Sequence, residues 1–147
     1  MKIAIGNDHA ATQLKDVFLG HLKDRDYVCV DFGVGEGQTA DYPDIARDVC
    51  KMVSSGAFER GILLCGTGAG MCMAANKIRG IRAVVCSDVY TAQMARTHND
   101  ANILCIGARV VGSGLALSIA DAFLDGEFEG GRHVGRVDKI MDLESVL

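Results

Sequence analysis

The sequence of 147 residues has no long apolar run, no C-x-x-C pair and no excess of positive charge. No run approaches the roughly 20 apolar residues that span a bilayer, and the N-terminus turns polar too early for a signal peptide. We therefore expect a cytoplasmic protein that contacts no membrane. The net charge of −4 argues against binding to nucleic acid. The spacing of the six cysteines matches neither a zinc site nor a thioredoxin-like motif.

What the sequence does contain is the balance of an ordinary globular protein, with 49% apolar and 23% charged residues. Its length suits one domain over residues 1–147. Short apolar runs alternate with segments whose apolar residues have helical spacing. The runs predict strands at Lys2–Gly6, Tyr27–Phe32, Gly61–Cys65, Arg82–Cys86 and Asn102–Ile106. The other segments predict helices at residues 10–24, Tyr42–Ser55, 68–78, Asp88–Thr97, Ser113–Leu124 and about 133–145.

This alternation predicts an α/β fold, a Rossmann-like three-layer sandwich with a five-stranded parallel sheet and a C-terminal helix. Ligands of such sheets bind beyond the carboxyl ends of the strands. That rule selects four loops in which to seek a site: Asn7-Asp8-His9, Cys65–Gly70, Ser87-Asp88 and Gly107–Arg109.

The loop Cys65–Gly70 carries three glycines directly after a predicted strand. Glycine lets the backbone approach a ligand closely, and successive N–H groups at a helix N-terminus attract negative charge. The same field favours the thiolate of Cys65, which can serve as a nucleophile or a base, and Thr67 adds a hydroxyl donor. The alternative is a tight turn around a buried cysteine. Three glycines so close to a strand end favour a small-molecule site.

Three familiar phosphate- or nucleotide-binding motifs do not fit this loop. It reads G-x-G-x-G, without the acidic residue that follows a dinucleotide-binding fingerprint by about 20 residues. No Gly-Lys-Ser/Thr follows, as a Walker loop would need. A cysteine phosphatase needs an arginine at the end of the loop to hold phosphate, but the sequence has Met71 there and no arginine before Arg79.

Polar residues follow two other predicted elements. Asp8-His9 come after the first strand and suit proton transfer to sugar hydroxyls; alternatively, Asp8 caps the next helix and His9 is incidental. His98-Asn99-Asp100 ends the helix after the fourth strand, where a histidine complements the helix dipole. Taken alone, the first motif leaves both interpretations open, and the second favours the cap.

A local basic cluster stands out in this acidic protein. Arg132 and Arg136 are four residues apart and share a helix face, with His133 between them. Two guanidinium groups with an imidazole suit a phosphate, whereas the alternative is a solvated charged face. Arg109, after the fifth strand, is placed to reach either the phosphate or a neighbouring subunit.

Seven segments of the sequence together resemble one known family. They are Gly6-Asn7-Asp8-His9, Asp41-Tyr42-Pro43, Gly61–Gly70, Ala74-Ala75-Asn76-Lys77, Gly80-Ile81-Arg82-Ala83, His98–Asn102 and Glu129–His133. The family is the type B ribose-5-phosphate isomerases, within the wider group of ribose-5-, allose-6- and galactose-6-phosphate isomerases. The resemblance runs essentially from end to end. It implies an aldose–ketose isomerase that uses no metal and no cofactor.

The resemblance also implies roles by position. Cys65 looks like the base that moves a proton between C1 and C2 of the open-chain sugar. His98 looks like the acid that opens the sugar ring, with Asp8 as a second acid. The cradle for the enediolate oxygen corresponds to Thr67 with Gly66, Gly68, Ala69 and Gly70. The sugar and phosphate ligands correspond to His9, Asn99, Arg109, Arg132, His133 and Arg136.

The resemblance further implies a homodimer or a dimer of dimers, with active sites shared between subunits. His98, Asn99 and Arg109 are then expected to face the partner's Cys65. The C-terminal helix is expected to contact the partner subunit. No nucleic acid and no membrane belongs to this assembly.

Members of the family differ in the base, and some use a glutamate on the helix after the glycine loop. Here that helix begins with Met71–Met73 and has no acid, so Cys65 takes the role. Asn7 and Met71–Met73 depart from the family pattern, which leaves the substrate open between ribose 5-phosphate and a six-carbon or less common sugar phosphate such as allose 6-phosphate. The other alternative is a non-catalytic sugar-phosphate-binding module, which the presence of both Cys65 and His98 disfavours.

Overall fold

Five parallel strands form one sheet in the computed structural model, which describes residues 1–146. The strands, in the spatial order β2-β1-β3-β5-β4, are β1 (Lys2–Asn7), β2 (Val28–Asp31), β3 (Arg60–Cys65), β4 (Ala83–Val85) and β5 (Ile103–Gly107). The helices are α1 (Thr12–Asp24), α2 (Tyr42–Ser54), α3 (Ala69–Ala75), α4 (Val89–Thr97), α5 (Ser113–Asp125) and α6 (Val134–Asp142), and 3₁₀ turns at Gly131–His133 and Leu143–Ser145 flank α6. The predicted parallel sheet and the predicted order of elements are confirmed.

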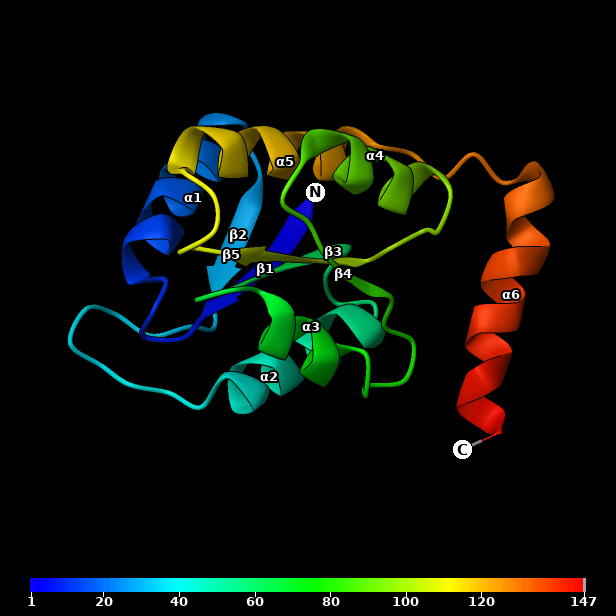
Figure 1. The fold of residues 1–147 in the computed structure, drawn as a ribbon, viewed down its shortest axis with the longest axis horizontal. Coiled ribbons are helices and arrows are strands. Elements are labelled where there is room, and N and C mark those ends of the chain that lie inside the picture. The colour runs from blue at the N-terminus through cyan, green and yellow to red at the C-terminus, as the bar shows by residue number, and fades with distance from the viewer. Residues whose placement is uncertain (147) are drawn as a thin grey trace.

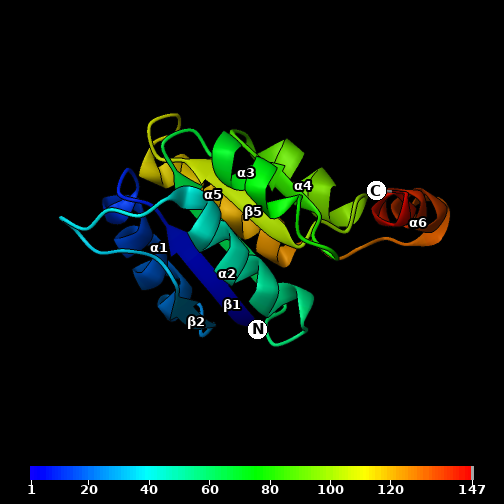
Figure 2. The ribbon, with the colours of Figure 1, turned by 90° about the horizontal axis from the view of Figure 1, so that it is seen from below.

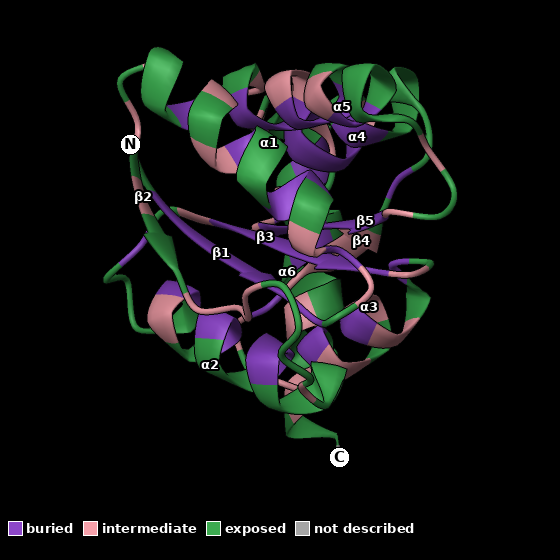
Figure 3. Ribbon diagram, turned by 90° about the vertical axis from the view of Figure 1, so that its left-hand side faces the viewer, coloured by how far each residue is buried: buried purple, intermediate pink, exposed green. Residues whose placement is uncertain are grey.

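Helices cover both faces of the sheet, which confirms the predicted three-layer sandwich. In Figure 1, α1, α4 and α5 lie above the sheet, and α2 and α3 lie below it. Successive residues of a strand point to opposite faces. Ile62 and Leu64 of β3 therefore pack in the core on one side, whereas Leu63 packs in the core formed with α2 and α3. Because both faces are covered (Figure 3), the central strands are buried and apolar along most of their length.

Two elements are shorter than expected because side-chain amides pair with the backbone at their ends. The amide of Asn76 donates to the carbonyl of Ala83 and accepts its N–H, each at 2.9 Å. This pairing ends α3 directly before Asn76 rather than at residue 78. The side chain of Asn102 accepts the N–H of Arg82 at 2.8 Å in the same way. The strand β4 therefore begins at Ala83 instead of Arg82.

The strand order reverses between β1 and β3, because β2 lies on one side of β1 and β3 lies on the other. Carboxyl strand ends at such a reversal leave a crevice in which parallel α/β sheets bind ligands. The loop after β2 is held close to this point, since the carbonyl of Val34 accepts hydrogen bonds from Asn7 at 3.0 Å and Lys15 at 2.7 Å. Asp8 and Cys65 flank the crevice, as the predicted site requires.

The C-terminal segment stands apart from both helix layers. In Figure 1, α6 lies beside the rest of the molecule, and Figure 2 shows it end-on, beyond α4. Hydrogen bonds tie it to the body, from Arg82 to Sδ of Met141 at 3.2 Å and from the N–H of Gly80 to Glu144 at 2.7 Å. Large apolar side chains are exposed along this segment: Val134, Ile140, Leu143 and Val146.

Within residues 1–146, no helix is both long enough and apolar enough to cross a bilayer.

Candidate active site

Cys65 is the last residue of β3 and pairs in register with Gly107 of β5. Its side chain is buried, with 5% of the residue exposed. The backbone N–H of Gly68 donates a hydrogen bond to Sγ at 3.1 Å. The loop that Cys65 begins is therefore folded so that one of its own backbone N–H groups points at the sulfur.

The glycine loop that follows β3 lies directly on the end of β5. Gly68 has a φ of +79°, in the left-handed region that glycine adopts without strain, and a Cβ added there would lie 2.9 Å from Val85. A Cβ added at Gly107 would lie 2.6 Å from the backbone of Thr67. The hydroxyl of Thr67 accepts the N–H of Ala69 at 3.3 Å, so its own hydrogen is free to donate. This close approach requires glycine on both sides.

Replacing Gly107 by alanine is expected to destabilise the protein by about 1–3 kcal/mol, because the new Cβ overlaps the backbone of Thr67. Urea unfolding of the purified variant measures the loss. Gly20→Ala is the matched control. It lies in α1 with nothing within 4 Å of the added Cβ, so we expect a gain of about 0.5–1 kcal/mol from helix propensity. Unchanged stability of Gly107→Ala would show that the loop does not rest on β5.

Asp8 lies beside this loop, between β1 and α1, and is buried. Its N–H donates to the carbonyl of Leu64 at 3.2 Å, and its carboxylate accepts the N–H of Ala10 at 2.9 Å. The interpretation of Asp8 as a helix cap is wrong, because Ala11 is the residue that precedes the first turn of α1. Asp8 instead shapes the turn before the helix, and this turn brings it next to the end of β3.

His9 and Arg109 extend the same group of residues. His9 is exposed and lines a hollow of about 470 Å³ between the beginnings of α1 and α5. The guanidinium of Arg109 lies beside the glycine loop of its own chain, since a Cβ added at Gly66 would be 3.5 Å from its Nη1. The expectation that Arg109 faces the partner's Cys65 stays a prediction. The long side chain of Arg109 folds back across the end of its own β5.

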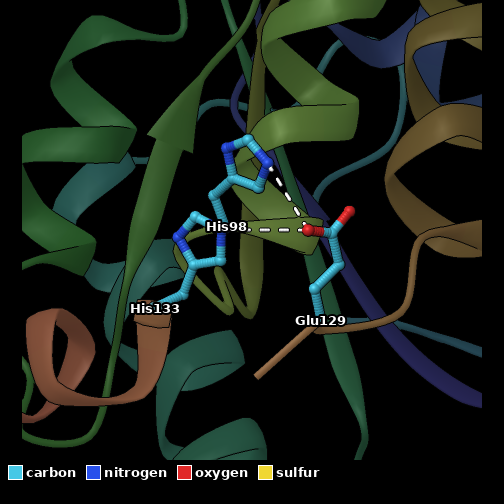
Figure 4. Close-up of side chains that lie close together, drawn as sticks. All are labelled: His98, Glu129 and His133. Atoms are coloured by element: carbon cyan, nitrogen blue, oxygen red, sulfur yellow. Dashed lines mark ion pairs between the residues drawn. The ribbon is translucent and has the colours of Figure 1, made fainter. Parts of the chain in front are cut away.

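His98, Glu129 and His133 form a second group (Figure 4). His98 is the C-cap of α4, and exposed Asn99 follows it. The rings of His98 and His133 stack, with centroids 4.3 Å apart and an angle of 11° between their planes. An oxygen of Glu129 lies 3.8 Å from Nε2 of each ring. The carboxylate of Glu129 is therefore placed to pair with a proton on either imidazole.

The two stacked imidazoles have different surroundings. His133 is only 6% exposed, and the pKa of this ring is lowered, first by burial and then by His98 and Arg132. Glu129 acts on that pKa in the opposite direction. The side chain of His98 is about one-third exposed. The neutral form is thus favoured at His133, and solvent and ligands have access to His98.

This cluster also has the composition of a metal site. One donor atom from each of the three residues lies within 4.8 Å of the others, which is close enough for one cation. A metal bound to imidazole, however, lies near the plane of the ring, along the nitrogen lone pair. Because the two rings stack in nearly parallel planes, no single position lies in both planes. The observed orientation suits shared protons better than a metal ion.

The predicted basic cluster is brought together only in part. Arg132 lies in the 3₁₀ turn before α6, Arg136 lies in α6, and both are exposed. His133, between them, is buried against His98 instead of facing solvent with the arginines. Among residues 1–146, neither arginine forms an ion pair with a carboxylate. Both guanidinium groups are therefore available to an anion.

The two groups of residues lie at opposite ends of the strands. The group with Cys65 lies at the carboxyl ends, and the group with His98 lies at the amino ends. Cys65 and Asp8 follow the carboxyl ends of β3 and β1. The helix α4 begins at that end, after β4, and runs back toward the amino ends of the strands. There the N–H of Asn102, shortly after His98, donates to the carbonyl of Arg82 at 3.0 Å. A single chain therefore does not bring His98 to Cys65.

Sequence reasoning assigned no role to Tyr42, Cys72 or Glu129. The ring of Tyr42 lies against the glycine loop, 2.8 Å from a Cβ added at Gly70. Its segment was among those that carried the family resemblance. Cys72, on α3, has a pKa lowered to about 7, mainly by a hydrogen bond with the thiol of Cys105. The sequence offered one indication of a role for Glu129, because it lies four residues before His133 and such residues can pair.

Comparisons with known proteins agree with this fold. The model of the Ribose/Galactose Isomerase family matches residues 3–140. Ribose-5-phosphate isomerase B of Escherichia coli (strain K12) is 48% identical over 97% of this chain and 96% of that protein. D-erythrulose-4-phosphate isomerase of Pectobacterium atrosepticum is 45% identical over 95% and 93%. A solved structure of ribose-5-phosphate isomerase B from Clostridium thermocellum is 51% identical, covers 99% of both chains and has a TM-score of 0.97.

The fold, the glycine loop and these relatives define an enzyme of the sugar-phosphate isomerase class. The chain belongs to the Ribose/Galactose Isomerase family. The resemblance to type B ribose-5-phosphate isomerases is thereby confirmed. The substrate, the catalytic residues and the assembly stay predictions.

Proposed function

We propose that this protein interconverts ribose 5-phosphate and ribulose 5-phosphate, with Cys65 as the base and His98 as the ring-opening acid. The observation that carries the proposal is the thiol of Cys65, which ends β3 at the strand-order reversal and accepts the N–H of Gly68 at 3.1 Å. In this proposal the sulfur reacts as a thiolate and serves as the base at the ligand-binding edge of the sheet. Relatives named for ribose 5-phosphate align over nearly the whole chain.

The reaction moves one proton between adjacent carbons. The thiolate of Cys65 removes the proton from C2 of the open-chain aldose, and the electron pair forms a cis-enediolate with its charge on O1. The proton then returns at C1, while the hydroxyl proton of O2 passes to O1. Negative charge develops on oxygen and needs donors that are already in place. The free hydroxyl hydrogen of Thr67 and backbone N–H groups of the loop Gly66–Gly70 supply them. Carbon C2 is oxidised as C1 is reduced within one molecule, so the proposed reaction uses no cofactor.

The phosphate lies at the other end of the sugar in this proposal. Arg132 and Arg136 are exposed and suit a doubly charged oxyanion. Arg132 and Arg136 flank His133, which stacks on His98, so the second copy that supplies His98 would also supply them. We propose that His9, at the hollow, and Arg109, beside the glycine loop, contact the sugar between the two ends. Binding energy from a phosphate remote from the reacting carbons orients the sugar for proton transfer.

A complete site requires two chains. Cys65 and His98 lie at opposite ends of the strands within one chain, so both can act on one sugar only when a second copy supplies His98 and Asn99. We therefore propose a homodimer, or a dimer of dimers, with shared sites. The exposed apolar side chains of the C-terminal segment favour this assembly, because a partner would cover them.

A panel of sugar phosphates tests the substrate. We expect the purified protein to interconvert ribose 5-phosphate and ribulose 5-phosphate with a kcat/KM at least about tenfold above that for allose 6-phosphate, since one additional carbon unit changes pocket binding by about that factor. Proton NMR follows both reactions directly. A higher kcat/KM for the hexose phosphate would reject ribose 5-phosphate as the preferred substrate.

A shorter sugar phosphate is the second candidate substrate. The relative named D-erythrulose-4-phosphate isomerase is 45% identical to this chain, close to the 48% of the ribose-5-phosphate isomerase B. Overall similarity therefore does not separate the two substrates. D-erythrulose 4-phosphate belongs in the panel, and a higher kcat/KM on it would replace the first proposal. Tight binding without turnover of any sugar phosphate would indicate a non-catalytic binding module.

A further inference from the structure

We propose that Glu129 is a positioning residue for His98: its carboxylate, 3.8 Å from Nε2 of both His98 and His133, holds His98 oriented and in its proton-donating form (Figure 4). A carboxylate that orients a catalytic imidazole is a general feature of acid–base sites. The inference rests on the proposed function, in which His98 opens the sugar ring.

The backbone presents Glu129 to the end of α4. Glu129 lies in the segment between α5 and α6, and its N–H donates to the carbonyl of Thr97 at 3.0 Å. Thr97 is the last residue of α4 and directly precedes His98. The hydrogen bond therefore fixes the two segments against each other. The carboxylate is held near the imidazole by the chain path as well as by its side-chain rotamer.

The stacked rings accommodate one positive charge rather than two. Two imidazolium ions with centroids 4.3 Å apart would repel each other. Burial lowers the pKa of His133, so this ring is the one that stays neutral. The shared carboxylate lies equally close to the more exposed ring of His98, which is the ring that a substrate can reach. His133 serves as the flat neutral surface on which His98 packs.

Other charged groups around His98 are paired with one another or act on His133. Three of them form ion pairs among themselves: Arg82, Arg96 and Asp100. Two more, Arg132 and Arg136, disfavour a proton on His133. Within residues 1–146, Glu129 is the carboxylate at ion-pair distance from His98.

Glu129→Gln tests the proposal, because it removes the charge and keeps the shape. We expect turnover of ribose 5-phosphate to fall about tenfold near pH 8 and to approach the wild-type value near pH 5.5. The reason is that without the carboxylate the imidazole keeps its proton only at lower pH. Exchange of a C1 hydrogen of ribulose 5-phosphate with D₂O should be unchanged, because this ketose phosphate has no ring to open. The isotope effect of C2-deuterated ribose 5-phosphate should shrink as ring opening becomes slower.

NMR titration of the His98 imidazole gives a readout that needs no substrate. Its midpoint should move to lower pH in Glu129→Gln. Glu127→Gln is the matched control, because Glu127 is exposed and only two residues away, and it should change neither the titration nor the pH profile. Glu129→Asp, which keeps the charge on a shorter side chain, should restore part of the turnover at high pH.

A loss that is equal at all pH values, or equal for ring opening and for C1 exchange, would overturn the proposal in favour of a purely structural role. An unchanged pH profile would overturn it as well. Failure of the wild-type protein to turn over ribose 5-phosphate would instead refute the proposed function. In that case the His98 titration still decides whether Glu129 controls the proton on this imidazole.

Discussion

Replacement of Cys65 by alanine is expected to lower kcat for ribose 5-phosphate by about 10²- to 10⁴-fold, because it removes the proposed base and leaves the glycine loop intact. Exchange of a C1 hydrogen of ribulose 5-phosphate with D₂O should fall by a similar factor. The affinity for ribulose 5-phosphate should change little, since the proposed phosphate ligands lie elsewhere. Steady-state kinetics, NMR exchange and calorimetry measure the three quantities.

Cys72→Ser is the matched control for this experiment. Cys72 is a half-buried thiol seven residues further along the chain, and its pKa is lowered to about 7. Among the cysteines, it is therefore the one that most needs to be distinguished from Cys65. We expect Cys72→Ser to keep turnover close to wild type. The opposite result, with Cys65→Ala active and Cys72→Ser inactive, would move the role of base to Cys72.

The second large effect is expected from mixing two inactive variants. His98→Asn should lose about 10²- to 10⁴-fold in turnover of ribose 5-phosphate, because asparagine keeps the end of α4 polar but cannot donate a proton as an acid. If each site combines Cys65 of one chain with His98 of another, a hybrid of Cys65→Ala and His98→Asn chains has one intact site. Random reassociation should then restore about a quarter of the wild-type activity.

The controls for the mixing experiment are each variant unfolded and refolded alone, which should stay inactive. A mixture in which one chain carries both substitutions and the other is His98→Asn should also stay inactive, because no site can then be complete. If the first mixture shows no rescue although native mass spectrometry detects hybrids, each site must lie within a single chain. That result would contradict the shared-site proposal.

Much of the fold was predictable because its signals are local. The runs at β1, β3 and β5 have continuous apolar and buried centres, as expected for strands that are buried on both faces. Helical spacing identified α1, α2 and α5 within two residues. The shorter ends of α3 and β4 were not predictable from spacing, because the pairing of Asn76 with Ala83 depends on a side chain that reaches across a turn.

The candidate site was predictable where a residue follows its strand directly. Cys65 and Asp8 meet because parallel strands bring their carboxyl ends to one edge. The proximity of Arg109 to the glycine loop of its own chain was not predictable, since the path of a long side chain depends on what it packs against. No role was predicted for Glu129 because His98, to which it lies close, is on a different element, far away in sequence.

The residue pattern alone was sufficient for the alternating α/β architecture and for a glycine loop that follows Cys65 at the end of β3. Both follow from backbone sterics and side-chain periodicity within a few consecutive residues. Only the tertiary structure revealed that His98 lies at the opposite end of the strands from Cys65, and that it stacks on His133 beside Glu129. These relations depend on the direction of α4 and on contacts between distant segments, which short-range periodicity does not encode.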